Sequence, residues 1–186
     1  MQILGIDPGY GTTGFALVEA HRGLHQLRQC GVITTPPGMD FPKRLETLYL
    51  DMDQLLKSAL PEALAIEELF FGHNVTTGIG VAQARGIILL AASQRDIPVF
   101  EYKPMQVKQA VVGYGGASKH QVMDMTRRIP QLRYVPHHMP GSFSGSAASP
   151  AEQPGSPLAC LFLCAGEPAK RYGVPQPEEE EPEPCE

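Results

Sequence analysis

The stretch that decides the fold opens the chain: Met1-Gln2-Ile3-Leu4-Gly5-Ile6-Asp7-Pro8-Gly9-Tyr10-Gly11-Thr12-Thr13-Gly14. Residues 3–6 form a short apolar run, which is typical of a strand buried on both faces. Asp7 ends this run, and an ionised carboxylate there is costly unless it meets a cation or hydrogen-bond donors. Pro8 and Gly9 then break the strand. Two interpretations stay open: Asp7 caps a turn, or it is a metal-binding carboxylate on a rigid sheet.

Length and composition predict one domain of ordinary size followed by a tail. The chain has 186 residues, enough for a substantial core. It contains no apolar stretch near the roughly 20 residues of a membrane span. No basic segment followed by an apolar one marks a signal peptide at the N-terminus. The four cysteines are Cys30, Cys160, Cys164 and Cys185. Because they lack the spacing of metal ligands, we expect reduced thiols in the cytoplasm.

Charge and proline content divide the chain near residue 128. Residues 1–128 carry 12 basic and 12 acidic side chains, whereas residues 129–186 carry 3 basic and 8 acidic ones. The net charge of −5 therefore belongs to the tail and does not exclude a nucleic-acid partner for the first part. Residues 129–186 also hold 11 of the 18 prolines. We predict a domain over residues 1–128 and disorder over residues 129–186.

Hydrophobic periodicity predicts an α/β domain. Strands are expected over residues 2–7, 14–19, 24–34, 63–66 and 97–102, and helices over residues 41–60, 74–95, 104–112 and 118–129. The first three strands form a meander, and the helix after them implies a parallel crossover onto the first strand. This order is that of the ribonuclease-H-like fold, a mixed five-stranded sheet flanked by helices. The predicted solvent face of the first helix comprises Lys43, Arg44, Glu46, Asp51 and Asp53, and the predicted N-caps of the second and last helices are Asn74 and Ser118.

Two carboxylates are expected to meet in this topology. The first and fourth strands lie side by side, so Asp7 and Glu67 would point into one shallow site. Two carboxylates in one site repel each other unless a divalent cation lies between them, and Mg²⁺ prefers such oxygen ligands. Two such ions activate a water and stabilise the leaving oxygen of a phosphodiester. The alternative is that Glu67 and Glu68 form a solvated pair at a strand end.

Several segments together resemble the RuvC family of Holliday-junction resolvases. They are residues 1–9 (MQILGIDPG), 65–70 (AIEELF), 83–86 (QARG), 98–102 (PVFEY) and 106–113 (QVKQAVVG). The likeness runs in order over about residues 1–128. It implies a homodimeric, Mg²⁺-dependent endonuclease with two ions per site, which cuts two opposed strands of four-way junction DNA in recombination and repair. The resemblance also implies a cytoplasmic location and a branch-migration helicase as partner.

The resemblance assigns roles to individual residues. Asp7 and Glu67 match the first two catalytic, metal-binding carboxylates. Phe70 matches an aromatic residue near the unpaired centre of the junction, although a core position would explain it equally. Lys108 and Lys119 match basic residues that approach the DNA backbone, and by themselves they would be solvated surface charges.

Other residues keep alternative interpretations. Arg85 lies on an otherwise apolar helix face, where it has a buried partner or contacts a second subunit or DNA. Thr12 and Thr13 orient Asp7 or a bound water, or they shape the turn. We interpret His73 and His120 as surface residues.

The tail departs from the family pattern. The family carries its late carboxylates on a final helix, but this chain has no Asp after Asp124. The corresponding stretch, residues 136–142, reads PHHMPGS, and its prolines and glycine disfavour a helix. We therefore expect weak or absent catalysis and a less stable, aggregation-prone domain. The change near residue 130 reflects either a shifted reading frame, which resequencing tests, or a diverged tail.

Two other functions fit parts of the sequence. The first is a junction-binding protein without catalysis, which shares the sheet, Lys108, Lys119 and Phe70. The second is an actin-like phosphotransferase, whose phosphate loop also has an Asp-x-Gly turn after the first strand, and ATP binding would distinguish it.

Overall fold

The computed structural model describes residues 1–21, 24–69, 75–118, 120–122, 125 and 170–171. The predicted order of elements is confirmed: β1 (Gln2–Asp7), β2 (Thr12–His21), β3 (Leu24–Thr34), α1 (Phe41–Ala59), β4 (Ala63–Glu67), α2 (Val75–Ser93), β5 (Val99–Tyr102) and α3 (Pro104–Val112). Of the helix predicted over residues 118–129, residues 118, 120–122 and 125 are described; Ser118 is not helical, and residues 120–122 and 125 are helical.

The sheet has the mixed topology that the sequence predicted. Its strand order is β3-β2-β1-β4-β5-β6, where β6 (Lys170–Arg171) is a two-residue strand that the sequence did not predict. β1 pairs antiparallel with β2, which places Asp7 opposite Gly14. β1 pairs in parallel with β4, with Ile6 opposite Ile66. The two strands that end in Asp7 and Glu67 are therefore direct neighbours and point the same way.

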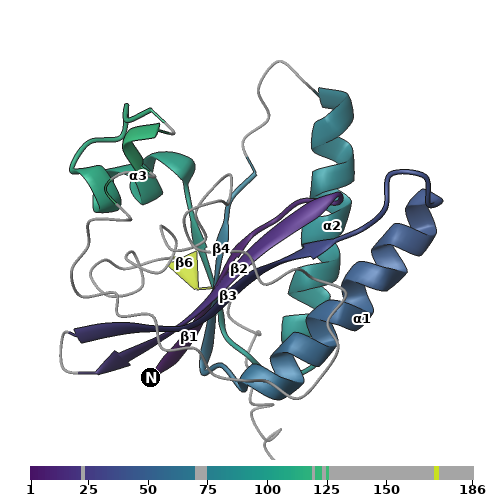
Figure 1. Ribbon diagram of the computed structural model, residues 1–186, viewed down its shortest axis with the longest axis horizontal. Coiled ribbons are helices and arrows are strands. Elements are labelled where there is room, and N and C mark those ends of the chain that lie inside the picture. The colour runs from purple at the N-terminus through teal and green to yellow at the C-terminus, as the bar shows by residue number, and fades with distance from the viewer. Residues whose placement is uncertain (22–23, 70–74, 119, 123–124, 126–169, 172–186) are drawn as a thin grey trace, which may run out of the picture.

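Helices cover both faces of the sheet and give two apolar cores. α1 and α2 lie side by side against one face, and α3 lies on the other face (Figure 1). Alternate residues of each strand enter different cores: Leu4 and Ile6 face α1 and α2, whereas Ile3 faces α3. The same alternation places Ala65 on the α3 side. Asp7 and Glu67 follow Ile3 and Ala65 at even spacing, so both side chains lie on the α3 face.

Helix boundaries follow local chemistry. α1 ends at Ala59, and its C-cap Leu60 adopts a left-handed conformation (φ 45°) and donates its backbone N–H to Leu56 O. Ser118 is the N-cap that the sequence predicted: Gln121 N donates to its Oγ at 3.3 Å, and Ser118 N donates to Gln121 Oε1 at 2.9 Å. Asn74, the predicted cap of α2, lies outside the described residues.

The described part of the tail is β6, which pairs antiparallel with β5 through Phe100 and Glu101. The rest of residues 129–186, predicted to be disordered, lies outside the described residues. In the described part of the chain, none of the helices combines the length and the apolar character needed to span a membrane.

Candidate active site

Two carboxylates, Asp7 and Glu67, form the centre of the site. Asp7 is the last residue of β1 and Glu67 is the last residue of β4. Both side chains are half-buried, and they lie on the same face of adjacent parallel strands. The sequence prediction that these two residues meet at one end of the sheet agrees with this register.

Burial and charge combine to perturb Glu67. Its pKa is raised from 4.5 to about 7, first because burial disfavours the charged form and second because the Asp7 carboxylate repels it. Lys108 on α3 opposes both effects and lowers the pKa. Lys108 is thus close enough to act electrostatically on Glu67. Its predicted role near DNA phosphates stays a prediction.

The Asp7 and Glu67 carboxylates provide part of the ligand set that a hard divalent cation requires. Two carboxylates on rigid strands offer the oxygen ligands that Mg²⁺ prefers, and Mg²⁺ keeps several waters in such sites. Their mutual repulsion is the electrostatic feature that a cation between them would remove. Among the described residues, however, no group of three or more His, Cys, Asp or Glu side chains is placed to hold a metal ion. Asp7 and Glu67 therefore form an incomplete ligand set within this part of the chain.

Arg85 has a buried partner, the first of the alternatives that its sequence position allowed. Its guanidinium forms an ion pair with Glu101 on β5, and the two side chains are 15% and 8% exposed. Arg85 Nε also donates to Glu67 O at 3.3 Å. This arginine therefore ties α2 to the ends of β4 and β5, directly behind the carboxylate site.

The turn after Asp7 is held by hydrogen bonds from Thr13, for which a turn role was one of the predicted alternatives, and from Thr35, which the sequence did not single out. Thr13 Oγ1 donates to Gly9 O at 2.6 Å and accepts from Gly9 N at 3.3 Å, so Thr13 shapes the turn. Thr35 Oγ1 donates to Tyr10 O at 2.5 Å, and Thr35 N donates to Gly11 O at 3.0 Å. These bonds fix residues 9–11 against the end of β3.

Arg44 completes this arrangement. Its Nε donates to Thr35 Oγ1 at 2.9 Å, and its guanidinium carbon lies 4.8 Å from the centre of the Tyr10 ring. The Tyr10 ring meets Phe41 edge-on, with ring centres 5.7 Å apart. Helical spacing predicted that Arg44 lies on the solvent face of α1, which is wrong: the residue is half-buried and packs onto the turn. Periodicity alone could not show this, because Arg44 contacts residues outside its own helix.

Asp53 is a second correction to the predicted solvent face of α1. Its carboxylate accepts from Arg95 Nε at 3.0 Å and pairs with Lys57 at 2.6 Å. The remaining predicted residues are placed as follows. His120 is exposed, as predicted. Phe70, Lys119 and His73 lie outside the described residues.

This mixed sheet, with paired carboxylates at the ends of β1 and β4, defines the class of ribonuclease-H-like nucleases. The family model for the crossover junction endodeoxyribonuclease RuvC matches residues 3–143, which extends past the domain boundary predicted at residue 128. The chain belongs to this RuvC family of crossover junction endodeoxyribonucleases.

Individual relatives support the assignment. A crossover junction endodeoxyribonuclease RuvC of Chloroflexus aurantiacus is 49% identical over 136 residues, which cover 73% of this chain and 83% of the relative. One from Brevibacillus brevis is 47% identical, with 73% and 82% covered. The solved structure of T. thermophilus RuvC in complex with Holliday junction substrate has a TM-score of 0.71 at 30% identity, and the match covers 88% of this chain and 93% of that one. A yeast mitochondrial resolvase, Ydc2, shares the fold at 14% identity with a TM-score of 0.54, over 71% of this chain and 65% of that one.

Proposed function

We propose that this chain binds four-way junction DNA and carries the first half of a phosphodiester-hydrolysing site. The observation that carries the proposal is the pair Asp7 and Glu67, set on neighbouring parallel strands in a chain of the RuvC family. Its likeness to a resolvase solved with a Holliday junction supports the choice of substrate.

Asp7 and Glu67 would hold Mg²⁺ at this site. When bound, the cation supplies charge stabilisation for the phosphodiester and lowers the pKa of its water. The protein's own part is to keep both carboxylates on rigid strands and to place Lys108 beside them. Because the described residues contribute two carboxylates and no Asp follows Asp124 in the sequence, we propose that cleavage by this chain is weak.

The experiment is Mg²⁺-dependent nicking of a synthetic four-way junction by the full chain. We expect junction binding in Ca²⁺ and little or no nicking in Mg²⁺. The control variant is Asp7→Asn, which removes the first carboxylate but leaves the strand intact. Robust nicking that Asp7→Asn abolishes would contradict the weak-cleavage proposal and show that the tail completes the site.

Junction binding without catalysis is the second candidate function, and the incomplete ligand set favours it. The gel shift in Ca²⁺ measures binding and the nicking assay measures chemistry, so the two assays separate the candidates. Family membership leaves the actin-like phosphotransferase without support. Lys108 is proposed as a phosphate contact because it lies beside the carboxylates, and Phe70 and Lys119 are proposed from the family pattern alone.

We also propose that the chain forms a homodimer through α2. Ile79, Gln83, Gly86 and Leu90 share one face of this helix and are all exposed, with Ile79 at 54% and Leu90 at 49%. A side chain added at Gly86 would meet no described atom within 4 Å. Exposed Ile79 and Leu90 side chains, with the small Gly86 between them, on a helix that packs its other face into the core are typical of a subunit interface. Association with a branch-migration helicase is proposed from the family alone.

A further inference from the structure

The paired register of β1 with β4 stops one residue short of the carboxylates. It ends at Ile6 and Ile66, although both strands run one residue further, to Asp7 and Glu67. The next bond of this parallel ladder would run from the backbone N–H of residue 8 to the C=O of Glu67. Residue 8 is Pro8, which has no N–H, so β1 offers the Glu67 carbonyl no donor.

The direction of the Glu67 carbonyl follows from the pairing of β4 with β5. Leu64 N donates to Pro98 O at 2.9 Å, and the acceptor directly precedes β5. Glu68 N donates to Tyr102 O, in β5, at 2.8 Å. Because successive residues of a strand direct their backbone groups to opposite neighbours, Glu67 directs its C=O towards β1.

Arg85 supplies a donor to this carbonyl. Its Nε donates to Glu67 O at 3.3 Å, and the same guanidinium forms the buried ion pair with Glu101. Glu101 lies on the sheet face that α1 and α2 cover, because it is two residues from Val99, which packs into that core. Arg85 therefore reaches the main chain of Glu67 from behind the sheet. The Glu67 carboxylate, on the α3 face, stays available to a cation.

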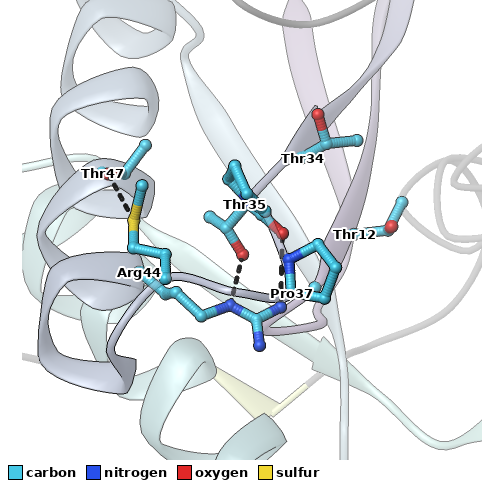
Figure 2. Close-up of a pocket in the computed structure, with 9 residues that line it drawn as sticks. Thr12, Thr34, Thr35, Pro37, Arg44 and Thr47 are labelled. Atoms are coloured by element: carbon cyan, nitrogen blue, oxygen red, sulfur yellow. Dashed lines mark hydrogen bonds between the residues drawn. The ribbon is translucent and has the colours of Figure 1, made fainter.

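Arg44 makes a similar contact at the end of another strand. Figure 2 shows it beside a pocket of about 720 Å³ that Thr12 and Thr34 also line. Its Nη2 donates to Thr35 O at 3.3 Å, just after the last residue of β3. Arg44 thus supports the end of β3 from α1, whereas Arg85 supports from α2 a strand that ends in a carboxylate.

We propose that Arg85 is a positioning residue for the divalent-cation site. Its hydrogen bond fixes the backbone of Glu67 where Pro8 cannot, and so keeps the Glu67 carboxylate at the separation from Asp7 that a shared cation requires. The inference rests on the proposed function, in which Asp7 and Glu67 hold Mg²⁺. The ion pair with Glu101 contributes to stability, and the bond to Glu67 O is a separate contribution of Arg85 to cation binding.

The test measures cation affinity in the full chain with Mn²⁺, which takes the same oxygen ligands as Mg²⁺. The electron paramagnetic resonance signal of free Mn²⁺ gives the bound fraction. Binding that Asp7→Asn abolishes belongs to the site, which removes the contribution of acidic residues elsewhere. Arg85→Met/Glu101→Met leaves no buried carboxylate unpaired, but methionine cannot donate to Glu67 O. We expect this variant to bind Mn²⁺ at the site about tenfold more weakly than wild type does.

Arg95→Met is the matched control. It removes another arginine that pairs with a carboxylate, that of Asp53, but between α2 and β5, at the opposite end of β4 from Glu67. Asp53 keeps Lys57 as a partner. We expect Mn²⁺ affinity within about twofold of wild type, because distant sites act independently.

Wild-type Mn²⁺ affinity in a folded Arg85→Met/Glu101→Met variant would overturn the inference and leave the proposed function intact, and so would an equal loss in Arg95→Met. A wild-type chain without any Mn²⁺ binding that depends on Asp7 would overturn both. If the double variant does not fold, NMR of the wild type decides. Mg²⁺ should then shift the Arg85 Nε–H signal but not that of Arg95, and an unshifted Arg85 signal would overturn the inference.

Discussion

At the scale of single residues, the site is a balance of charges in a half-buried position. Burial and the neighbouring Asp7 both raise the pKa of Glu67 to about 7, and Lys108 offsets part of this rise. The repulsion between the Asp7 and Glu67 carboxylates, together with the burial of Glu67, lowers the stability of the folded state when both groups are ionised. A divalent cation at the proposed Asp7–Glu67 site would offset this loss of stability.

Glu67→Gln should make the stability of the protein less dependent on pH. The folded state holds the Glu67 proton more tightly than the unfolded chain does. Ionised Glu67 therefore destabilises the fold above about pH 7, and this loss of stability disappears below about pH 4.5, where the group is protonated in both states. We expect the variant to be more stable than wild type by about 2 kcal/mol at high pH. This value is discounted for partial exposure, since a tenfold change in proton affinity is worth about 1.4 kcal/mol.

Urea unfolding in the absence of divalent ions, from about pH 4.5 to about pH 8, measures this difference. The advantage of Glu67→Gln should shrink steadily as the pH falls. Glu68→Gln serves as the control for loss of a carboxylate at the same strand end. A difference between Glu67→Gln and wild type that stays constant with pH would contradict the assignment.

Arg85 is expected to be structural, through its ion pair with Glu101. Arg85→Met should cost about 3–5 kcal/mol of unfolding free energy, because it leaves the Glu101 carboxylate buried and unpaired. The double variant Arg85→Met/Glu101→Met should recover most of the loss. Urea titration of the two variants decides the point. If the double variant is as unstable as the single one, the ion pair is not the source of the loss.

At the scale of elements, the turn between β1 and β2 is the part that positions Asp7. Its backbone is anchored by Thr13 from within and by Thr35 from the end of β3. Arg44 joins the turn to α1, and the ring of Tyr10 packs between α1 and α2, since a side chain at Gly80 would lie 3.0 Å from it. The end of β3, α1 and α2 therefore all contact the turn that follows Asp7.

Thr35→Val should loosen this turn. The substitution removes the hydroxyl that donates to Tyr10 O and accepts from Arg44, at a site that is 5% exposed. We expect a loss of about 1–3 kcal/mol and faster amide exchange in residues 9–11. Thr47→Val is the control, because its hydroxyl donates to Lys43 O within α1 and to Met39 Sδ but not to the turn, and it should cost about 0.5 kcal/mol or less. Unchanged exchange in the turn would contradict the role of Thr35.

At the scale of the whole molecule, the face of α2 that exposes Ile79 and Leu90 is expected to decide the oligomeric state. Ile79→Glu/Leu90→Glu places charges on the proposed interface and should convert a dimer into a monomer. Light scattering coupled to size exclusion measures the mass. Met105→Glu, at another exposed apolar residue on the opposite side of the sheet, should leave the mass unchanged. A wild-type monomer would refute the dimer proposal.

The sequence by itself determined the order of elements, the topology and the carboxylate pair. Strand and helix periods are local properties, so residues 24–34 were predicted with the bounds that β3 has. The parallel pairing of β1 with β4 followed from the helix between them, because a crossover through a helix has few solutions. Asp7 and Glu67 could be paired in advance because each ends a buried strand.

The tertiary structure decided which polar residues face each other across elements. Arg44 and Asp53 have the helical spacing of solvent-facing residues, yet one packs on the turn after Asp7 and the other binds Arg95. The partner of Arg85 and the pocket beside Thr12 and Thr34 likewise depend on segments that are far apart in the chain. Local sequence patterns predict which face of a helix or strand is exposed to solvent. Contacts between side chains of different elements depend on packing, which exists only in the folded molecule.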